Sequence, residues 1–188
     1  MRGGDKFFVI LRVVLALSIP CAVRSSPEKE GVPDEQRHFS AEDGGVRHTM
    51  PLPRDVLKIL SQTETVKALW KGTEIPRGGI PRSWFSGSVV HLAGVDERDL
   101  IVQGADAMAG ANVTTFWIFR HGTKGYSLVL EVAALDLTAE NHRTNGLLDV
   151  TARSATGSEV FASYFQFSGN QSRYVEIKST REMIGEPR

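Results

Sequence analysis

Short runs of β-branched and aromatic residues, separated by turn-forming residues, fill the chain from about Ser86 onward and limit the folds open to it. Most of the separations are too short to hold a crossover helix, so neighbouring strands must pair in antiparallel fashion. The predicted strands are Ser86–Leu92, Leu100–Gln103, Thr115–Arg120, Ser127–Ala134, Leu147–Ala155, Phe161–Phe167 and Arg173–Lys178. The predicted turns between the later strands are "HGTKG", "TNG", "ATGSE" and "SGNQS".

Two of these strands indicate how the sheet is covered. In "LLDVTARS", apolar residues alternate with Asp149, Thr151 and Arg153, which is typical of a strand with one face in the core and one in water. In "FWIF", residues 116–119, both faces are apolar. We therefore expect residues 116–119 to form a central strand that is covered on both faces or lies next to a binding surface.

Two short helices are predicted before the strands. Pro53 suits the first turn of a helix, and the apolar residues between 56 and 60 recur at helical spacing. Thr63 is placed to cap a second helix, which ends at Gly72. The sequence thus predicts an α+β fold in which two short N-terminal helices pack on an antiparallel β-meander of about six or seven strands.

The N-terminus has the pattern of a secretory signal peptide over residues 1–25. A short basic lead, "MRGGDK", precedes the apolar stretch "FFVILRVVLALSIP", and "CAVRSS" supplies small residues for cleavage after Ser25. An uncleaved anchor and a lipoprotein attached through Cys21 are the alternatives. Cleavage would export the domain to the periplasm or the exterior and would remove Cys21, the only cysteine, so no disulfide or thiolate site is expected.

The remainder divides into three predicted parts. Residues 26–50 are charged, contain Pro and Gly, and are predicted to form a flexible spacer. Residues 51–180 are predicted to form the single α+β domain, and residues 181–188 a C-terminal tail.

Charge argues against two classes of partner. Lys and Arg together number 22 and Asp and Glu also number 22, so no net charge draws the chain to nucleic acid or to an anionic membrane. We expect no nucleic-acid partner and no stable membrane insertion after signal cleavage. The expected partner is an unknown protein or envelope ligand.

The acidic loop in "HLAGVDERDLIVQG" is the one candidate for a metal site. Asp96, Glu97 and Asp99 are closely spaced, as in loops that bind calcium. However, His91 stands near the place of the first acidic ligand and Arg98 adds a positive charge among the carboxylates. We predict a plain hairpin turn here, with no metal and no cofactor.

The aromatic and histidine residues supply the other candidate sites. Trp84 and Trp117, with Trp70, could form a platform for stacking on carbohydrate, although tryptophans on helix and strand faces more often belong to the core. The candidate binding residues are therefore Trp84, Trp117, Asp96, Glu97 and Asp99.

No catalytic residue is assigned from the sequence. The motifs G-x-S-x-G, H-E-x-x-H, the P-loop and G-x-G-x-x-G are absent from the chain. The histidines of the predicted domain are His91, His121 and His142, the last beside Arg143 in a predicted polar loop. A hydrolase would need His91 or His121 together with distant Ser and Asp residues.

Several segments resemble uncharacterised bacterial exported proteins that carry one FG-GAP-like or VCBS-like segment. The resemblance rests on "WFSGSVVHLAGVDERDLIVQG", "ANVTTFWIFRHGTKGYSLVLEVAALDL", "RTNGLLDVTARSA" and "YFQFSGNQSRYV", and it covers roughly Pro53 to Lys178. It implies an aspartate-rich loop that can bind calcium, but "LAGVDERD" departs from the expected Asn-Gly-Asp-Gly pattern. The predicted function is a non-enzymatic exported binding module. The alternatives are a hydrolase with a histidine-based site and a weak calcium-binding FG-GAP-like domain.

Overall fold

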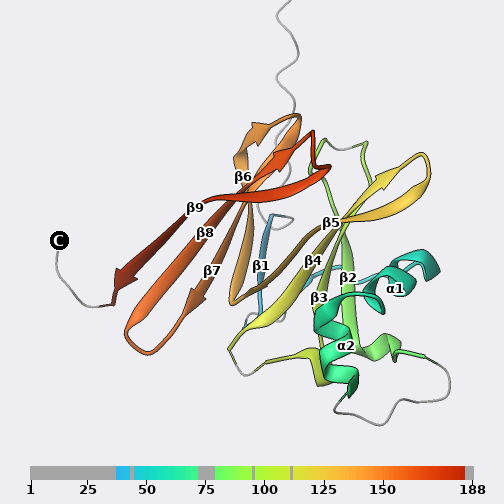
Figure 1. The fold of residues 1–188 in the computed structure, drawn as a ribbon, viewed down its shortest axis with the longest axis horizontal. Helices are drawn as coiled ribbons and strands as arrows, with labels where there is room; N and C mark the ends of the chain where they lie inside the picture. Colours follow the sequence, from blue (N-terminus) through green and yellow to red (C-terminus); the bar gives the residue numbers. More distant parts are fainter. Residues whose placement is uncertain (1–36, 43–44, 72–78, 95, 111, 185–188) are drawn as a thin grey trace, which may run out of the picture. The chain divides into compact units, whose positions relative to one another are not determined.

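The computed structural model describes residues 37–42, 45–71, 79–94, 96–110 and 112–184 (Figure 1). The predicted signal peptide, the first part of the predicted spacer and residues 185–188 lie outside the described residues. The elements in chain order are β1 (His38–Ser40), α1 (Arg54–Leu60), α2 (Glu64–Lys71), the 3-10 turn η2 (Arg82–Trp84), β2 (Phe85–Val90), β3 (Asp99–Gly104), the 3-10 turn η3 (Asp106–Met108), β4 (Thr114–Gly122), β5 (Gly125–Ala134), β6 (Asp136–Thr144), β7 (Leu147–Ala155), β8 (Glu159–Ser168) and β9 (Arg173–Met183).

The strands form two antiparallel sheets. One has four strands in the order β2-β3-β4-β5, and the other has five in the order β1-β6-β7-β8-β9. The predicted α+β class and the antiparallel pairing are confirmed. The prediction of one meander is wrong, because the chain changes sheets at Leu135. The Leu135 N–H donates to the Arg153 carbonyl and its own carbonyl accepts the Ala41 N–H, so the chain continues into β6 instead of reversing beside β5.

Two strands of the five-stranded sheet were missed from the sequence. β1 lies in the predicted flexible spacer, where Phe39 and Val46 are buried in the core. The spacer prediction is therefore wrong for its described part. β6 was missed because "DLTAENHRT" is largely polar and carries no apolar run. β7 coincides with its prediction at both ends, whereas β9 runs to Met183, into the predicted tail.

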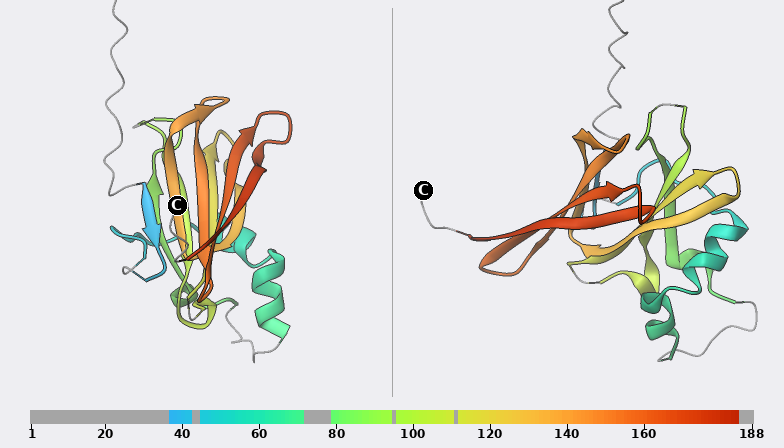
Figure 2. Two further views of the ribbon diagram at one scale, coloured as in Figure 1. Left: turned by 90° about the vertical axis from the view of Figure 1, so that its left-hand side faces the viewer. Right: turned by 45° about the horizontal axis from the view of Figure 1, so that its top comes forward.

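Strand β4 lies inside the four-stranded sheet and is buried on both faces, as the sequence predicted. Phe116 and Ile118 pack in a core between the two sheets, and Trp117 and Phe119 pack in a second core beneath the helices. Figure 2 shows α1 and α2 on the side of the four-stranded sheet that faces away from the five-stranded sheet. The helix residues in the second core are Val56, Leu60 and Val66.

One hydroxyl joins the two helices. The Thr63 hydroxyl donates to the Leu60 carbonyl at 2.9 Å and accepts the Val66 N–H at 3.4 Å. It therefore satisfies a carbonyl at the end of α1 and an N–H at the start of α2, the capping role predicted for this residue.

The hairpin between β6 and β7 is held by turn geometry and by two long-range hydrogen bonds. Asn145 and Gly146 have φ angles of 51° and 84°, which suit the type I′ turn of a tight hairpin. The Asn145 amide donates to the Phe167 carbonyl at 2.7 Å, and the Tyr174 hydroxyl donates to the Leu148 carbonyl at 2.7 Å. Burial raises the pKa of Tyr174, so this hydroxyl remains protonated and able to donate.

Replacing Tyr174 with Phe removes the hydrogen bond to the buried Leu148 carbonyl, and we expect the free energy of unfolding to fall by about 1–2 kcal/mol. Urea unfolding followed by fluorescence measures the change. Tyr164→Phe is the matched control, because the Tyr164 hydroxyl has no hydrogen bond within the described residues. This substitution should change the free energy of unfolding by less than about 0.5 kcal/mol. Equal losses in both variants would contradict a stabilising role for the Tyr174 hydroxyl.

Candidate functional site

A groove of about 550 Å³ lies on the five-stranded sheet, over strands β6 to β9. Its polar residues on β7 alternate with Leu148, Val150 and Ala152, which pack in the core between the sheets. The groove therefore lies on the face of this sheet that turns away from the core. The side chains that define it are Glu140, Asn141 and His142 of β6, Asp149, Thr151 and Arg153 of β7, Tyr164 and Gln166 of β8, and Ile177 of β9.

Two irregularities in strand pairing border the groove. Ala139 pairs with Val150 and Arg143 with Leu148, so residues 140–142 stand opposite Asp149 alone. Between β8 and β9, Tyr164 pairs with Lys178 and the next residue, Phe165, pairs with Glu176. Ile177 of β9 is therefore unpaired, and it is 57% exposed. Because an extra residue bends a strand and redirects its side chains, the two bulges open the sheet surface here.

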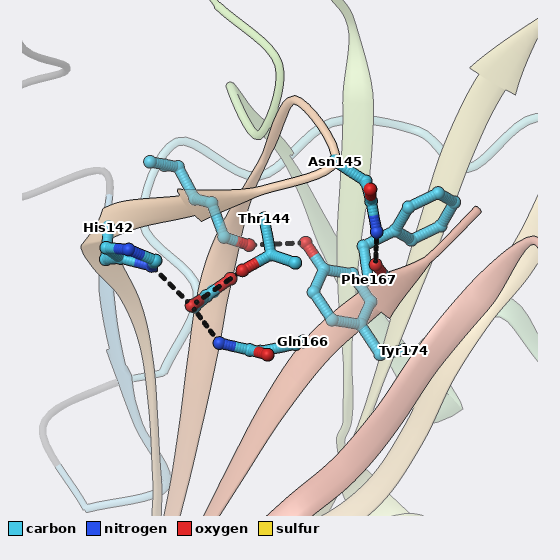
Figure 3. A network of polar contacts seen from close by, with 8 residues as sticks. His142, Thr144, Asn145, Gln166, Phe167 and Tyr174 are labelled. Atoms are coloured by element: carbon cyan, nitrogen blue, oxygen red, sulfur yellow. Dashed lines mark hydrogen bonds and ion pairs between the residues drawn. The ribbon is translucent and has the colours of Figure 1, made fainter.

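The carboxylate of Asp149 contacts three polar side chains at one end of the groove, those of His142, Thr144 and Gln166, which Figure 3 labels. Its Oδ2 lies 2.8 Å from Nδ1 of His142, and it accepts hydrogen bonds from the Thr144 hydroxyl at 3.2 Å and the Gln166 amide at 3.1 Å. The Asp149 side chain is only 13% exposed, whereas that of His142 is 74% exposed. The carboxylate thus holds an exposed imidazole in place and leaves its Nε2 without a protein partner among the described residues.

Two acceptor atoms beside this cluster have no partner within the described residues. They are Oδ1 of Asp149 and the hydroxyl oxygen of Thr151, a residue that is only 2% exposed. A buried polar atom without a hydrogen bond costs about 1–3 kcal/mol, and such an atom in a native fold calls for an explanation. Both atoms are enclosed by the protein.

A row of in-register residues crosses the whole sheet through Thr151. His38 pairs with Thr138, Thr138 with Thr151, Thr151 with Tyr164, and Tyr164 with Lys178. The His38 ring nitrogen lies 3.1 Å from the Thr138 hydroxyl oxygen, and the Lys178 ammonium lies 5.5 Å from the centre of the Tyr164 ring. The outer face of the sheet therefore carries imidazole, aromatic and ammonium groups in one row, with the hydroxyls of Thr138 and the buried Thr151 between them.

The tryptophans proposed for ligand stacking belong to the core. Trp117 is fully buried in β4, and Trp84 is buried in the same cluster beneath the helices, where Phe85 packs edge-on against Trp117. A ring enclosed by protein cannot stack on a ligand, so the prediction of Trp84 and Trp117 as binding residues is wrong.

The acidic loop connects β2 and β3, which are antiparallel neighbours, so the predicted hairpin is confirmed. Asp96 and Glu97 are exposed, whereas Asp99 is buried in β3 and its Oδ1 accepts the His121 N–H at 2.9 Å. These three carboxylates do not converge. Across the residues that the structure describes, no group of three or more His, Cys, Asp and Glu side chains is arranged to hold a metal ion.

The structure also separates the histidines considered for catalysis. Nδ1 of His91 lies 2.9 Å from the Glu97 carbonyl, and the exposed His121 ring packs against Tyr126. Neither imidazole is hydrogen-bonded to a Ser or Asp side chain in the described part of the chain. Of His91, His121 and His142, the one whose ring is hydrogen-bonded to a carboxylate is His142, which sequence analysis set aside. The two-residue turn at Asn145-Gly146 fixes which residues pair across the hairpin. Counting back from this turn places His142 opposite Asp149, so the sequence contained a signal for the pair.

Comparison of the chain with protein-family models, curated proteins and solved structures gives no match. The resemblance to exported proteins with an FG-GAP-like or VCBS-like segment therefore stays a prediction. No helix in the described ranges is long and apolar enough to cross a membrane.

Replacing Asp99 with Asn should stabilise the fold at neutral pH. Burial raises the pKa of Asp99 above its ordinary value of 3.8, so the ionised side chain weakens the folded state at about pH 7. Asn keeps the oxygen that accepts the His121 N–H and removes the charge. We expect the free energy of unfolding to rise, and this gain should shrink as the pH falls through the raised pKa towards 3.8.

Urea unfolding at a series of pH values tests this expectation, with Asp96→Asn as the control, since Asp96 is exposed in the same loop. The control should show no comparable gain. A gain for Asp99→Asn that is independent of pH would mean that the buried charge is not its cause.

Proposed function

We propose that this protein is an exported, non-enzymatic binding module that engages a protein or envelope ligand through the groove on the outer face of its five-stranded sheet. The observation that carries the proposal is a groove bordered by two β-bulges, in which the Asp149 carboxylate holds the exposed imidazole of His142. Export rests on the signal-like pattern of residues 1–25.

The groove combines fixed polar groups at its base with more exposed side chains at its rim. The His142–Asp149–Gln166 cluster supplies oriented polar groups at the base, and Arg153 and Ile177 are exposed around it. Binding sites commonly combine a few fixed polar groups with apolar and aromatic contact area, which Tyr164 and Ile177 supply here. The strands hold these groups on a rigid framework, so a ligand meets a surface that is already formed.

Removing the side chains of Arg153 and Ile177 at the rim of the groove should weaken binding without unfolding the domain. We expect the double variant Arg153→Ala/Ile177→Ala to lose at least about tenfold in affinity for a partner recovered from the envelope fraction of the native host, because contacts at the groove are lost. The affinity of the full chain for the recovered partner is measured by calorimetry. Arg173→Ala/Ile184→Ala is the matched control, because Ile184 is 55% exposed, like Ile177, but lies outside the groove. Equal affinities of the two variants would refute the assignment of the groove.

A second candidate function is hydrolysis, which the His142–Asp149 contact favours. An imidazole held by a carboxylate at 2.8 Å is the base half of many hydrolytic sites. In that case Nε2 of His142 would activate a water molecule or a hydroxyl of the substrate.

The binding-module hypothesis predicts that His142→Ala leaves any hydrolysis of p-nitrophenyl acetate and p-nitrophenyl phosphate at the level of the unaltered chain. Release of nitrophenolate is followed by absorbance, with His121→Ala as the control, since the His121 ring is exposed but has no carboxylate partner. A turnover activity that His142→Ala lowers by about 100-fold or more, with His121→Ala unaffected, would establish the hydrolase in place of the binding module.

A further inference from the structure

A second and smaller pocket, of about 190 Å³, lies between β1 and the edge strand β2. Arg47, His48, Ser88 and His91 contribute its polar lining, and Phe39 and Met50 contribute apolar walls. A volume of this size corresponds to a few water molecules at ~30 Å³ each, so the pocket suits a small ion and not a larger organic ligand.

The pocket forms because the segment before α1 runs along the free edge of β2. The Met50 N–H donates to the Gly87 carbonyl at 2.8 Å, and the two residues form an antiparallel bridge. His48, two residues before this bridge, has a positive φ of 54°, and the chain there lines the same pocket as Val89 and His91. Val46 is buried in the core between the sheets and anchors the segment that carries Arg47 and His48.

The side chains of the lining that can carry a charge are all basic. Arg47 is charged at all ordinary pH values, and His48 and His91 become cations when protonated. No acidic side chain lines the pocket within the described residues, and neither Arg47 nor either histidine forms an ion pair there. The described carboxylates nearest in sequence, Glu42, Asp96 and Glu97, do not line it. The charge that complements this lining is negative.

The hydrogen bond made by Nδ1 of His91 determines whether Nε2 of the same ring accepts or donates a hydrogen bond. A carbonyl oxygen only accepts, so the contact of Nδ1 with the Glu97 carbonyl at 2.9 Å places a proton on Nδ1. Nε2 is then an acceptor in the neutral ring and becomes a donor only when the ring takes up a second proton. An anion that accepts a hydrogen bond from Nε2 must therefore bind together with a proton.

We propose that this pocket binds a small oxyanion, of the tetrahedral or carboxylate type, through the Arg47 guanidinium and the protonated rings of His48 and His91. The forked donors of Arg match the geometry of such oxygens. This site shares no residue with the groove on the five-stranded sheet, so its test is independent of the proposed function.

Calorimetric titration of the full chain with sodium sulfate and with sodium acetate, at constant ionic strength in chloride, tests the proposal. Sulfate keeps its charge between about pH 6 and pH 8, so a change in its affinity over that range comes from the protein and not from the anion. We expect saturable sulfate binding that is at least about fivefold tighter at the lower pH. Tighter binding of acetate than of sulfate would identify the carboxylate as the preferred form.

Variants assign the effect to the pocket. Arg47→Gln should weaken sulfate binding at least about tenfold, and His91→Gln, whose amide can still donate to the Glu97 carbonyl, should reduce the dependence on pH. Arg82→Gln is the matched control, because Arg82 is exposed outside this pocket, and it should leave binding unchanged. Thermal unfolding in chloride confirms that each variant is folded. The proposal is overturned if neither sulfate nor acetate binds saturably, or if Arg47→Gln, folded like the unaltered chain, binds the anion as tightly.

Discussion

The constraint on which the rest of the structure depends is the need to cover β4 on both faces. Phe116 and Ile118 face one way and Trp117 and Phe119 the other, and all four side chains are buried. A single sheet open to water on one side could not bury both sets, and each large apolar side chain left exposed would forfeit about 1.5–3 kcal/mol. The helices cover one face of β4 and the five-stranded sheet covers the other.

The way in which β4 is covered explains why the polar side chains of the groove lie on the five-stranded sheet. The four-stranded sheet is covered on both sides, so its interior strands offer few side chains to a ligand. The five-stranded sheet has its apolar residues directed into the core and is free to carry Asp149, Thr151 and Tyr164 on its other face. The groove is thus a consequence of a three-layer arrangement in which, of the two sheets, the five-stranded one has an open face.

The parts of the fold that could be predicted from the sequence are those with a strong local signal. The alternation in β7, the apolar residues of β4 and the turn at Asn145-Gly146 each follow from a short stretch of sequence. The change of sheets at Leu135 could not be foreseen, because it depends on backbone partners in β7 and beside β1.

The candidate site was less predictable than the fold. Asp149 was recognised only as a residue on the polar side of its strand, because its importance depends on a bulge in the polar strand β6, for which the sequence shows no apolar pattern. The buried state of Trp84 and Trp117 depends on helices that pack from elsewhere in the chain. Arg47 and His48 lie in a segment whose composition suggested disorder, and their position next to His91 follows from the bridge between Met50 and Gly87.

The pairing of β1 with β6 has a consequence for the order in which the chain can fold. His38 lies opposite Thr138, and the two residues are 100 positions apart in sequence, whereas β6 to β9 pair through short hairpins. Local hairpins close quickly, while a long loop must lose more conformational entropy before its ends meet. During synthesis β1 appears well before its partner exists, so the first strand to emerge is among the last to find its place. Until it does, β6 is an unprotected edge and Phe39 has no core to enter.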